Sequence, residues 1–417
     1  MSTILERSTK TLPLIAAFLL SAATASADTV TDWNAKANEI FTAAGTGTAP
    51  AVRAMAILET AQYEAVNAIT KKYPAGELKL EAAPGASLDA AIAAANRAVL
   101  TKIVPAQQAA IDAAYQAAIA KIADGAPKTA GIELGEKAAA AVLAARADDG
   151  AAVKEQYRPA ATPGVYVPTA IPVVPHWGQR RPWALKTSSQ LRPAAPPALT
   201  SPTWAKDYNE IKVMGDKAST KRTAEQTAIA VFWDTTQPTI YHGLLRSLAV
   251  APGREITRNA RLFAAAAEAA DDALIAVFDA KYQYNFWRPI TAIRNGDNDG
   301  NDATERDPSW LSLNDTPMHP EYPCAHCIMG GAIGAVMQDD VGKGKLPLLT
   351  TTSPSAKGAQ RSWKTIDMVV SEISNARVWG GMHFRNSAIV GTTMGKQIGA
   401  IVAAKFATKT APKTKTK

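Results

Sequence analysis

Long alanine-rich segments with little strand character are the feature that most constrains how this chain can fold. The clearest run from Leu88 to Ala123, with an expected break at Pro105, and from Gly131 to Ala147. Alanine has the highest helix propensity, and its small side chain lets neighbouring helices approach closely. The pattern predicts an all-α fold of helical bundles, and a chain of 417 residues is long enough to bury a sizeable core.

Proline divides the chain into regions. Residues 159–202 hold ten of the 26 prolines, so this stretch cannot be regular helix. We expect an N-terminal helical region over residues 28–157, a Pro-rich wrapping linker over 158–204 and a second helical bundle over 205–406. Apolar periodicity predicts helices in the second bundle at Thr223–Trp233, Pro238–Ala249, Glu255–Phe286, Ala325–Gln338, Lys364–Val378 and Ser387–Phe406.

Both ends of the chain differ from its body in composition. Arg7 and Lys10 precede an apolar run from Leu12 to Leu20, and Ala25-Ser26-Ala27 has the small residues of a cleavage site. Residues 1–27 are therefore expected to be a signal peptide, which predicts a secreted or periplasmic protein. For residues 407–417, a basic tail rich in Thr, Ala, Pro and Lys, we expect disorder. No later stretch has about 18 uninterrupted apolar residues, so no transmembrane segment is expected in the mature protein.

The formal net charge of +8 is concentrated at the C-terminal end. Five lysines with no acid among them contribute most of it: Lys405, Lys409, Lys413, Lys415 and Lys417. The rest of the chain is close to neutral and has no basic stripe with interleaved aromatic residues. Nucleic acid is therefore not an expected partner.

One acidic stretch, Asn295 to Asp307, resembles a calcium-binding loop. It lacks the glycine that such a loop needs at its sixth position, and no well-placed glutamate follows. We therefore expect a solvated loop there rather than a metal site.

Three short strings in the second half carry the side chains best suited to chemistry. They are, in order, Lys281-x6-Arg288-Pro289, Pro323-Cys324-Ala325-His326 and Arg377-x5-His383. Cations avoid burial unless an anion meets them, and imidazoles can transfer protons or act as nucleophiles. The apolar run after the second string predicts a helix start, whose free N–H groups can bind an anion. Gly380-Gly381 permits a turn, so that the third string can converge from two helices. Together the strings predict a site for a tetrahedral oxyanion.

These strings resemble the K-x6-RP, PSGH and SR-x5-H signatures of the type 2 phosphatidic acid phosphatase superfamily. That superfamily includes bacterial acid phosphatases and vanadium-dependent haloperoxidases. Further stretches resemble the haloperoxidase branch: Arg53 to Ile69, Ser219 to Thr227, Phe232-Trp233-Asp234, His176-Trp177-Gly178 and Arg181-Pro182-Trp183. The likeness covers most of the chain beyond residue 27.

The resemblance implies a role for each matching residue. His383 would be the axial ligand of vanadate in a haloperoxidase, or the nucleophile that carries a phosphohistidine in a phosphatase. His326 would act as general acid or base. Lys281, Arg288 and Arg377 would neutralise the equatorial oxygens, with the backbone N–H of Ala325 as a further donor. Vanadate mimics a phosphoryl transition state, so one scaffold can serve both chemistries.

The expected function is a vanadate-dependent haloperoxidase that oxidises halide with hydrogen peroxide, in which Lys281 would polarise the peroxide. One alternative is a soluble acid phosphatase that hydrolyses a phosphate ester and needs no cofactor. A second is a degenerate, non-catalytic member of the superfamily. His319 stands where algal bromoperoxidases have histidine, which hints at bromide or iodide; its structural alternative is a His-Pro turn residue without contacts. Assembly as a homo-oligomer is left open.

Several positions depart from the family pattern. The signature serine is Cys324, the glycine is Ala325, and a phosphatase aspartate four residues after His383 is Ser387. The last change weakens the phosphatase reading unless another group orients His383. Asp234 is the candidate carboxylate partner for an arginine or an imidazole, with a helix-terminal surface acid as its structural alternative.

Cys324 would be exposed to oxidants in a haloperoxidase site. Cys327 lies three residues further on, close enough on a helical turn for a disulfide, and an exported protein meets oxidising conditions. We therefore expect a Cys324–Cys327 disulfide in the floor of the site.

Overall fold

The computed structural model describes residues 27–76 and 78–407. The all-α prediction is confirmed, because the elements of this part are helices apart from two short strands. Nearly all of the expected signal peptide and of the basic tail lies outside the described residues. Within those residues, no helix combines the length and the apolar character that a membrane crossing requires.

Five helices make up the first part: α1 (Thr29–Ala43), α2 (Thr48–Thr70), α3 (Leu88–Ile103), α4 (Gln108–Ile119) and α5 (Ala126–Ala145). The expected break at Pro105 is a short 3-10 turn, η1 (Pro105–Gln107), between α3 and α4. The small residues serve close packing, because a Cβ added at Gly135 would clash with the backbone of Ala91 on α3. Helix α5 therefore lies directly against α3.

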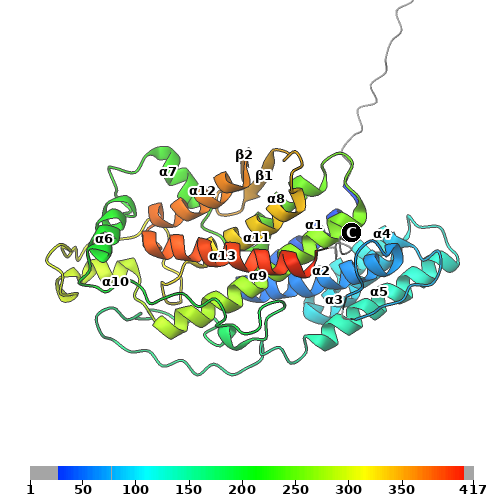
Figure 1. Ribbon diagram of the computed structural model, residues 1–417, viewed down its shortest axis with the longest axis horizontal. Helices are drawn as coiled ribbons and strands as arrows, with labels where there is room; N and C mark the ends of the chain where they lie inside the picture. Colours follow the sequence, from blue (N-terminus) through cyan, green and yellow to red (C-terminus); the bar gives the residue numbers. More distant parts are fainter. Residues whose placement is uncertain (1–26, 77, 408–417) are drawn as a thin grey trace, which may run out of the picture.

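The second part holds α6 (Pro202–Met214), α7 (Ala224–Phe232), α8 (Pro238–Ala249), α9 (Ile256–Tyr284), α10 (Pro289–Arg294), α11 (Ala325–Val341), α12 (Ile366–Trp379) and α13 (Arg385–Lys405). A third short turn, η3 (Gly296–Asn298), follows α10. Helix α9 lies at the centre of the molecule, contacting α2 on one side and α11 and α13 on the other (Figure 1). The closest pair is α11 and α13, where Gly395 meets the backbone of Ile328. This central packing places the C-terminal end of α9 beside the N-terminal ends of α11 and α13.

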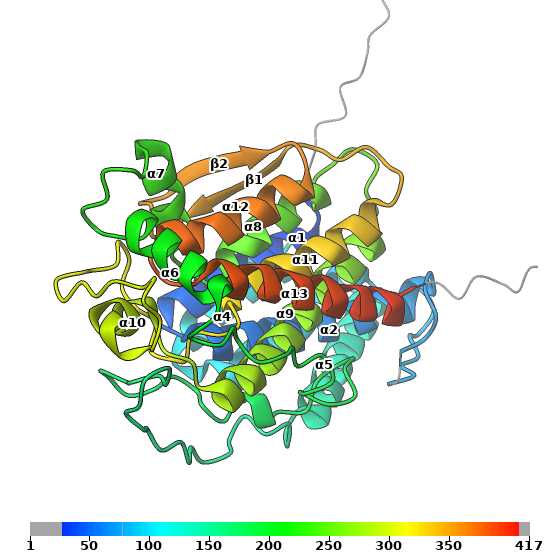
Figure 2. The ribbon, with the colours of Figure 1, turned by 60° about the vertical axis from the view of Figure 1, so that its left-hand side comes forward.

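The proline-rich stretch wraps around the molecule with one short 3-10 turn, η2 (Trp177–Gln179), as a long irregular segment in Figures 1 and 2. It is anchored by Arg180, which pairs with Asp149 at 2.7 Å and with Asp271 of α9 at 2.6 Å. The backbone N–H of Trp183 donates to Asp272, also on α9, at 2.6 Å. The linker is therefore tied to both parts of the chain through buried charges. The boundaries of the five expected regions stay a prediction.

A β-hairpin in the second part was not foreseen. Strand β1 (Leu349–Ser353) pairs antiparallel with β2 (Ala359–Trp363), in the register Leu349 to Trp363, and covers α8 (Figure 2). Three consecutive threonines favour a strand, since β-branched residues suit a pleated surface. Hydrogen bonds to residues distant in the sequence also hold strand β1 in place, because Thr351 donates to the carbonyl of Ile240 and Ser353 donates to the carbonyl of Phe232.

The expectation of a solvated loop over residues 295–307 is wrong at its centre. Asp299 is only 5% exposed, and its carboxylate accepts hydrogen bonds from Trp204 Nε1 at 2.7 Å and from Thr304. In the described part of the chain, no group of three or more acidic, histidine or cysteine side chains could hold a metal ion. The carboxylate of Asp299 therefore stabilises the loop by accepting hydrogen bonds from buried donors.

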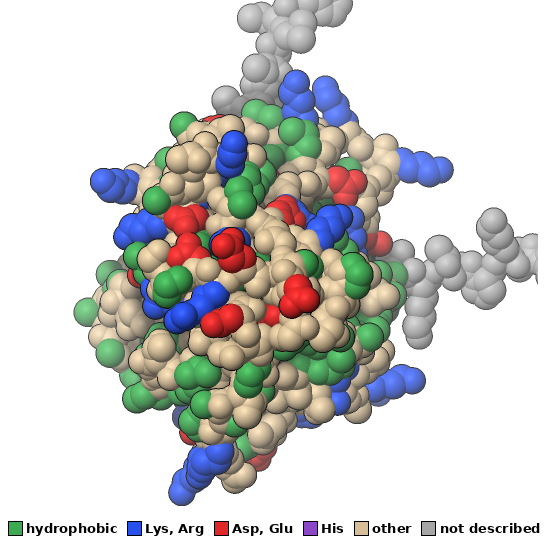
Figure 3. Space-filling view, turned by 90° about the vertical axis from the view of Figure 1, so that its left-hand side faces the viewer, with side chains coloured by type: hydrophobic (Ala, Val, Ile, Leu, Met, Phe, Trp, Pro, Cys, Tyr) green, Lys and Arg blue, Asp and Glu red, His purple; other side chains and the backbone are tan. Residues whose placement is uncertain are grey.

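The surface at the end of the molecule that carries α6 and α10 has mixed charge. In Figure 3, Lys and Arg side chains are interspersed with Asp and Glu side chains on this face. Arg385 illustrates the mixture, since it pairs with Glu210 at 2.6 Å. This face therefore offers no single-sign basic patch to a polyanion.

Candidate active site

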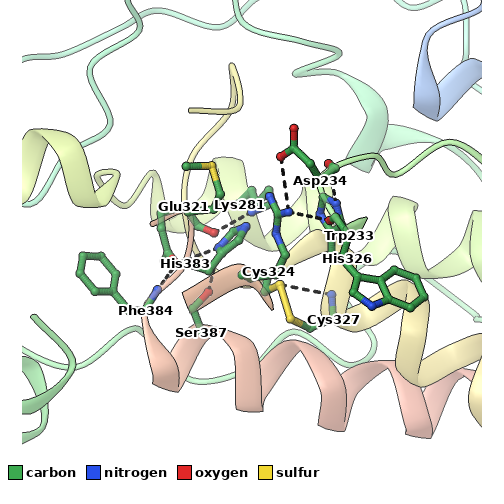
Figure 4. Close-up of a disulfide and its surroundings, with 12 residues drawn as sticks. Trp233, Asp234, Lys281, Glu321, Cys324, His326, Cys327, His383, Phe384 and Ser387 are labelled. Atoms are coloured by element: carbon green, nitrogen blue, oxygen red, sulfur yellow. Dashed lines mark hydrogen bonds and ion pairs between the residues drawn. A yellow bond between two sulfur atoms is a disulfide. The ribbon is translucent and has the colours of Figure 1, made fainter. Parts of the chain in front are cut away.

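The ends of several helices bring the residues of the three strings together, and Figure 4 shows Lys281, His326 and His383 among them. Lys281 lies in the last turn of α9, Arg288 just before α10, Ala325 and His326 in the first turn of α11, Arg377 in the last turn of α12, and His383 just before α13. Each of these residues is buried. The turn expected between Arg377 and His383 is present, because Gly381 adopts a φ of 78°, which favours glycine.

His383 is held by a buried carboxylate. Its Nδ1 lies 2.8 Å from Oε1 of Glu321, which also accepts the backbone N–H of Phe384 at 3.0 Å. The hydroxyl of Ser387 is farther from Nδ1, at 3.4 Å. The guanidinium of Arg288 faces Nε2 and can only donate, so Nε2 keeps its lone pair and Nδ1 carries the proton toward Glu321. Glu321 and Arg288 together therefore fix the orientation and the tautomer of the imidazole.

The guanidinium of Arg288 faces that lone pair. Its Nη1 lies 3.4 Å from His383 Nε2 and donates to the carbonyl of Met382 at 3.0 Å. On its other side, Nε donates to the carbonyl of His319 at 2.8 Å, and Nη2 lies 2.9 Å from Nδ1 of the same residue. His319 also packs edge-on against Phe278. The alternative that His319 is a turn residue without contacts is therefore wrong, since it helps to orient Arg288.

Lys281 approaches the same place from α9. Its Nζ donates to the backbone carbonyls of Pro320 at 2.8 Å and of Glu321 at 2.7 Å. The side chain is completely buried. Burial, reinforced by the positive charge of Arg288, lowers the pKa of Lys281 well below 10.5. An additional negative charge nearby would favour the protonated form.

Arg377, Asp234 and His326 form the other side of the site. Nη1 of Arg377 donates to the carbonyl of Trp233 at 2.8 Å and lies 3.8 Å from the carboxylate of Asp234. His326 Nε2 lies 3.1 Å from the backbone carbonyl of Asp234. Asp234 thus meets an arginine through its side chain and an imidazole through its backbone. Its carboxylate is 39% exposed, so this side of the site reaches solvent.

The start of α11 lies between these two groups of residues. Cys324 is its N-cap residue, and its sulfur accepts the backbone N–H of Cys327 at 3.2 Å. The structure links Cys324 and Cys327 by a disulfide. The N–H groups of Ala325 and His326 belong to the first turn, where a helix offers no internal acceptor. They can donate to an anion held between the surrounding cations.

Electrostatics indicate that this site is built for an anion. Lys281, Arg288 and Arg377 are each no more than 1% exposed, whereas the nearby carboxylates are those of Glu321 and Asp234. Burial lowers the pKa of Arg288 and of Arg377 to about 10. Excess buried positive charge is costly unless a counter-charge meets it. An oxyanion would supply that charge.

The imidazoles are neutral under ordinary conditions. Burial, together with the neighbouring cations, lowers the pKa of His326 and of His383 well below 6.5. One donor still lacks an acceptor, because the buried Nε of Arg377 has no hydrogen-bond partner among the described residues. Three cations, first-turn N–H groups, an unsatisfied guanidinium nitrogen and an imidazole lone pair together fit a tetrahedral oxyanion such as vanadate or phosphate.

Sequence reasoning missed Glu321. It matches none of the three strings, and the only available signal was a charged residue between Pro320 and Pro323, close to a helix start. Burial raises its pKa to about 7, against the opposing effects of Lys281 and Arg288. Glu321 therefore supplies the carboxylate contact to His383 that Ser387 cannot.

Comparisons with known proteins agree with this architecture. A family model described as the VCPO second helical-bundle domain matches residues 261–411. Vanadium chloroperoxidase of Curvularia inaequalis is 33% identical over 141 residues, which cover 28% of this chain and 22% of that protein. The matched segment thus spans about a fifth of the length of that curated relative.

Solved structures match over more of the chain. A bacterial vanadium-dependent iodoperoxidase has a TM-score of 0.80 at 22% identity and covers 92% of this chain and 98% of its own. An apo-type bacterial vanadium-dependent chloroperoxidase has a TM-score of 0.71 at 16% identity, covering 85% of this chain and 92% of its own. At such identities these two structures establish the fold alone. The family match shows that residues 261–411 are similar to the second helical-bundle domain of vanadium chloroperoxidase, and the solved structures show that the chain shares the fold of bacterial vanadium-dependent haloperoxidases.

Proposed function

We propose that this protein is a vanadate-dependent haloperoxidase that oxidises halide with hydrogen peroxide. The observation that carries the proposal is the state of His383 within its surroundings. Its Nδ1–H is directed at the buried carboxylate of Glu321, so that its Nε2 lone pair faces the guanidinium of Arg288, and the buried charges of Lys281 and Arg377 also act on this imidazole. A neutral imidazole with a free lone pair is the form that binds a metal centre.

The roles of the residues follow from their contacts. His383 would hold vanadate through Nε2, and Lys281, Arg288 and Arg377 would neutralise its oxygens. The N–H of Ala325 would donate from the first turn of α11. Bound vanadate would supply the Lewis-acid centre at which peroxide is activated for oxygen transfer to halide. His326, whose Nε2 faces the carbonyl of Asp234, has its other ring nitrogen available to accept a proton during that reaction.

The halide is proposed to be iodide or bromide rather than chloride. His319 contacts Arg288 directly, so a polar imidazole borders the proposed oxyanion site. The solved relative that covers the larger part of this chain is named an iodoperoxidase, which supports the same choice.

A phosphatase function remains the second candidate, and one contact favours it. The phosphatase aspartate is absent, but Glu321 bonds to His383 Nδ1 at 2.8 Å and could orient that imidazole for attack on phosphorus. The product would be a phosphohistidine, which water then hydrolyses. No cofactor would be needed.

Export to an oxidising compartment is proposed as well. The expected signal peptide lies almost wholly outside the described residues, and support comes from the Cys324–Cys327 disulfide, since such bonds persist mainly in oxidising environments. The proposed substrates are small molecules. Assembly as a homo-oligomer stays a prediction.

The test compares both activities in one preparation. The purified protein is loaded with orthovanadate and assayed for peroxide-dependent iodination and bromination, and a vanadate-free sample is assayed against a chromogenic phosphate monoester. We expect vanadate-dependent halogenation that His383→Ala abolishes. Phosphate ester hydrolysis without halogenation would favour the phosphatase. Inactivity in both assays, without oxyanion binding, would identify a non-catalytic member of the family.

A further inference from the structure

The disulfide lies between the two helix starts that carry the imidazoles of the site. Cys324 is the N-cap residue of α11, directly before Ala325 and His326. Its backbone N–H donates to the carbonyl of Ser387 at 3.3 Å, and Ser387 lies in the first turn of α13, four residues after His383. Figure 4 shows the disulfide beside Ser387 and close to both imidazoles. A change at Cys324 is therefore transmitted to both helix starts.

The packing around the two sulfurs leaves no room for adjustment. Cys324 is 0% exposed and Cys327 is 1% exposed, and both pack against Ala388 of α13. One turn further along α13, a Cβ added at Gly391 would lie 2.6 Å from the carbonyl oxygen of Cys324. The backbones of α11 and α13 are thus in direct contact at this point.

Opening the disulfide requires the atoms around it to move. Bonded sulfurs are about 2.05 Å apart, whereas non-bonded atoms of similar size keep a separation of about 3.5–4.0 Å. Two thiols therefore need more than about 1 Å of extra space. Because Gly391 blocks movement of Cys324 toward α13, the first turn of α11 has to shift or Cys324 has to rotate away from its capping position. A shift of the first turn displaces the N–H groups of Ala325 and His326, and rotation of Cys324 leaves the N–H of Cys327 without its cap, which loosens the same turn.

We propose that the Cys324–Cys327 disulfide is a positioning element that holds the first turn of α11 in the geometry that binds the oxyanion. Opening the bond weakens oxyanion binding. This inference rests on the proposed function only through the oxyanion site, which both candidate activities share. A misplacement of about 1 Å in a preorganised site can cost about 100-fold, and we expect a 10- to 100-fold loss of oxyanion affinity.

The bond can be opened chemically with a dithiol reductant. One thiolate of the dithiol attacks a cysteine sulfur, breaking the S–S bond and forming a mixed disulfide. Its second thiolate then closes a cyclic disulfide and releases the other cysteine. The dithiol loses two electrons, the protein disulfide gains them, and two protons end on Cys324 and Cys327.

The bond can also be removed genetically, with a matched rescue. Cys327→Ala leaves Cys324 as a lone thiol, which is a weak cap for the N–H of residue 327. Adding Cys324→Ser to that variant supplies a hydroxyl, which is among the best N-cap groups. The single variant is therefore expected to bind an oxyanion 10- to 100-fold less tightly, and the double variant to recover most of the loss.

The experiment measures the affinity for inorganic phosphate by calorimetry. Phosphate is the probe because a dithiol would reduce vanadate. Four samples are compared: the oxidised protein, the protein reduced with dithiothreitol, Cys327→Ala, and Cys324→Ser/Cys327→Ala. Alkylation with mass spectrometry counts the thiols, and near-ultraviolet circular dichroism reports whether each sample is folded. The reduced wild-type sample keeps the test valid if a variant does not fold.

The outcomes separate this inference from the proposed function. Weaker binding by the reduced protein and by Cys327→Ala, with recovery in the double variant, supports the positioning role. Equal phosphate affinity in the folded oxidised and bond-free samples overturns it while leaving the oxyanion site intact. Absence of phosphate binding by the oxidised protein overturns both.

Discussion

Replacing Arg377 by methionine should weaken oxyanion binding at least about 100-fold at little cost to stability. At neutral pH the folded protein holds this guanidinium charged although burial lowers its pKa from 12.5 to about 10. Each pKa unit corresponds to about 1.4 kcal/mol, so burying the charge costs about 3 kcal/mol. The penalty is fully present below pH 10 and disappears as the pH rises toward 12.5, because the unfolded chain holds the proton longer there.

Removing the side chain also removes favourable contacts. The carbonyl of Trp233 loses its donor, which costs about 1–3 kcal/mol. The ion pair with Asp234 is long, at 3.8 Å, and the Asp234 side chain is 39% exposed, so its loss costs less than about 1 kcal/mol. The free energy gained by removing the buried charge nearly equals the free energy lost with these contacts. The free energy of unfolding in anion-free buffer should therefore stay within about 2 kcal/mol of the wild type.

Binding should respond very differently. An arginine that donates two charge-assisted hydrogen bonds, each worth about 1.5–3 kcal/mol, accounts for about 100- to 10,000-fold in affinity. Urea unfolding and phosphate calorimetry measure the two quantities. Phosphate at 100 times its dissociation constant should stabilise the wild type by about 2.7 kcal/mol and leave Arg377→Met unchanged.

Arg180 provides the matched control. It is equally buried, but Asp149 and Asp271 bond to it at 2.7 and 2.6 Å, and these carboxylates outweigh burial and raise its pKa. Arg180→Met leaves the buried carboxylate of Asp271 without a cation, although Asp149 keeps Arg53 and Arg146, and should cost about 3–5 kcal/mol of stability. If Arg377→Met proves as destabilising as Arg180→Met, and still binds phosphate like the wild type, the reasoning is refuted.

Three further changes test other parts of the structure. Glu321→Gln keeps an acceptor for His383 Nδ1 but loses the charge, so orthovanadate affinity measured by calorimetry should fall about 10- to 100-fold. Ser387→Ala should change that affinity less than about threefold. Equal effects of the two variants would contradict the assignment of Glu321 as the group that orients His383. Burial raises the pKa of Glu59 to about 8, so the unfolded state binds fewer protons and stability should fall by about 2 kcal/mol from pH 6.5 to 8. In Glu59→Gln, the free energy of unfolding measured with urea should change much less with pH. An unchanged pH dependence would contradict the raised pKa of Glu59. Gly395→Ala should cost about 2–3 kcal/mol by thermal unfolding, because the added methyl group meets the backbone of α11. Gly47→Ala, with its nearest neighbour at 3.9 Å, should cost less than about 1 kcal/mol, which reflects only the weaker N-cap of alanine. Similar costs would argue against the close helix contact.

Helix positions were largely readable from the chain. The expected helix over Pro238–Ala249 has the same bounds in the structure, and the break at Pro105 falls between α3 and α4. Both depend on local effects, namely side-chain periodicity and the geometry of proline. The hairpin could not be read in the same way, because Thr351 and Ser353 bond to carbonyls more than 100 residues away.

The candidate site likewise combines residues that local motifs predicted with one residue that they did not. Lys281, Arg288, Arg377, His326 and His383 stand in local strings, and the structure brings these residues together. Glu321 belongs to no string, since its role depends on the fold placing its carboxylate 2.8 Å from a residue 62 positions further along.

The sequence by itself determined that this protein is helical, where its main helices lie, and that it carries cations and imidazoles suited to an oxyanion. Helix propensity and motif spacing act over a few residues, so the chain displays them directly. Only the tertiary structure decided which carboxylate orients His383, that His319 contacts Arg288, and that Asp299 is buried. These outcomes depend on burial and on contacts between distant segments, which exist only after the helices have packed.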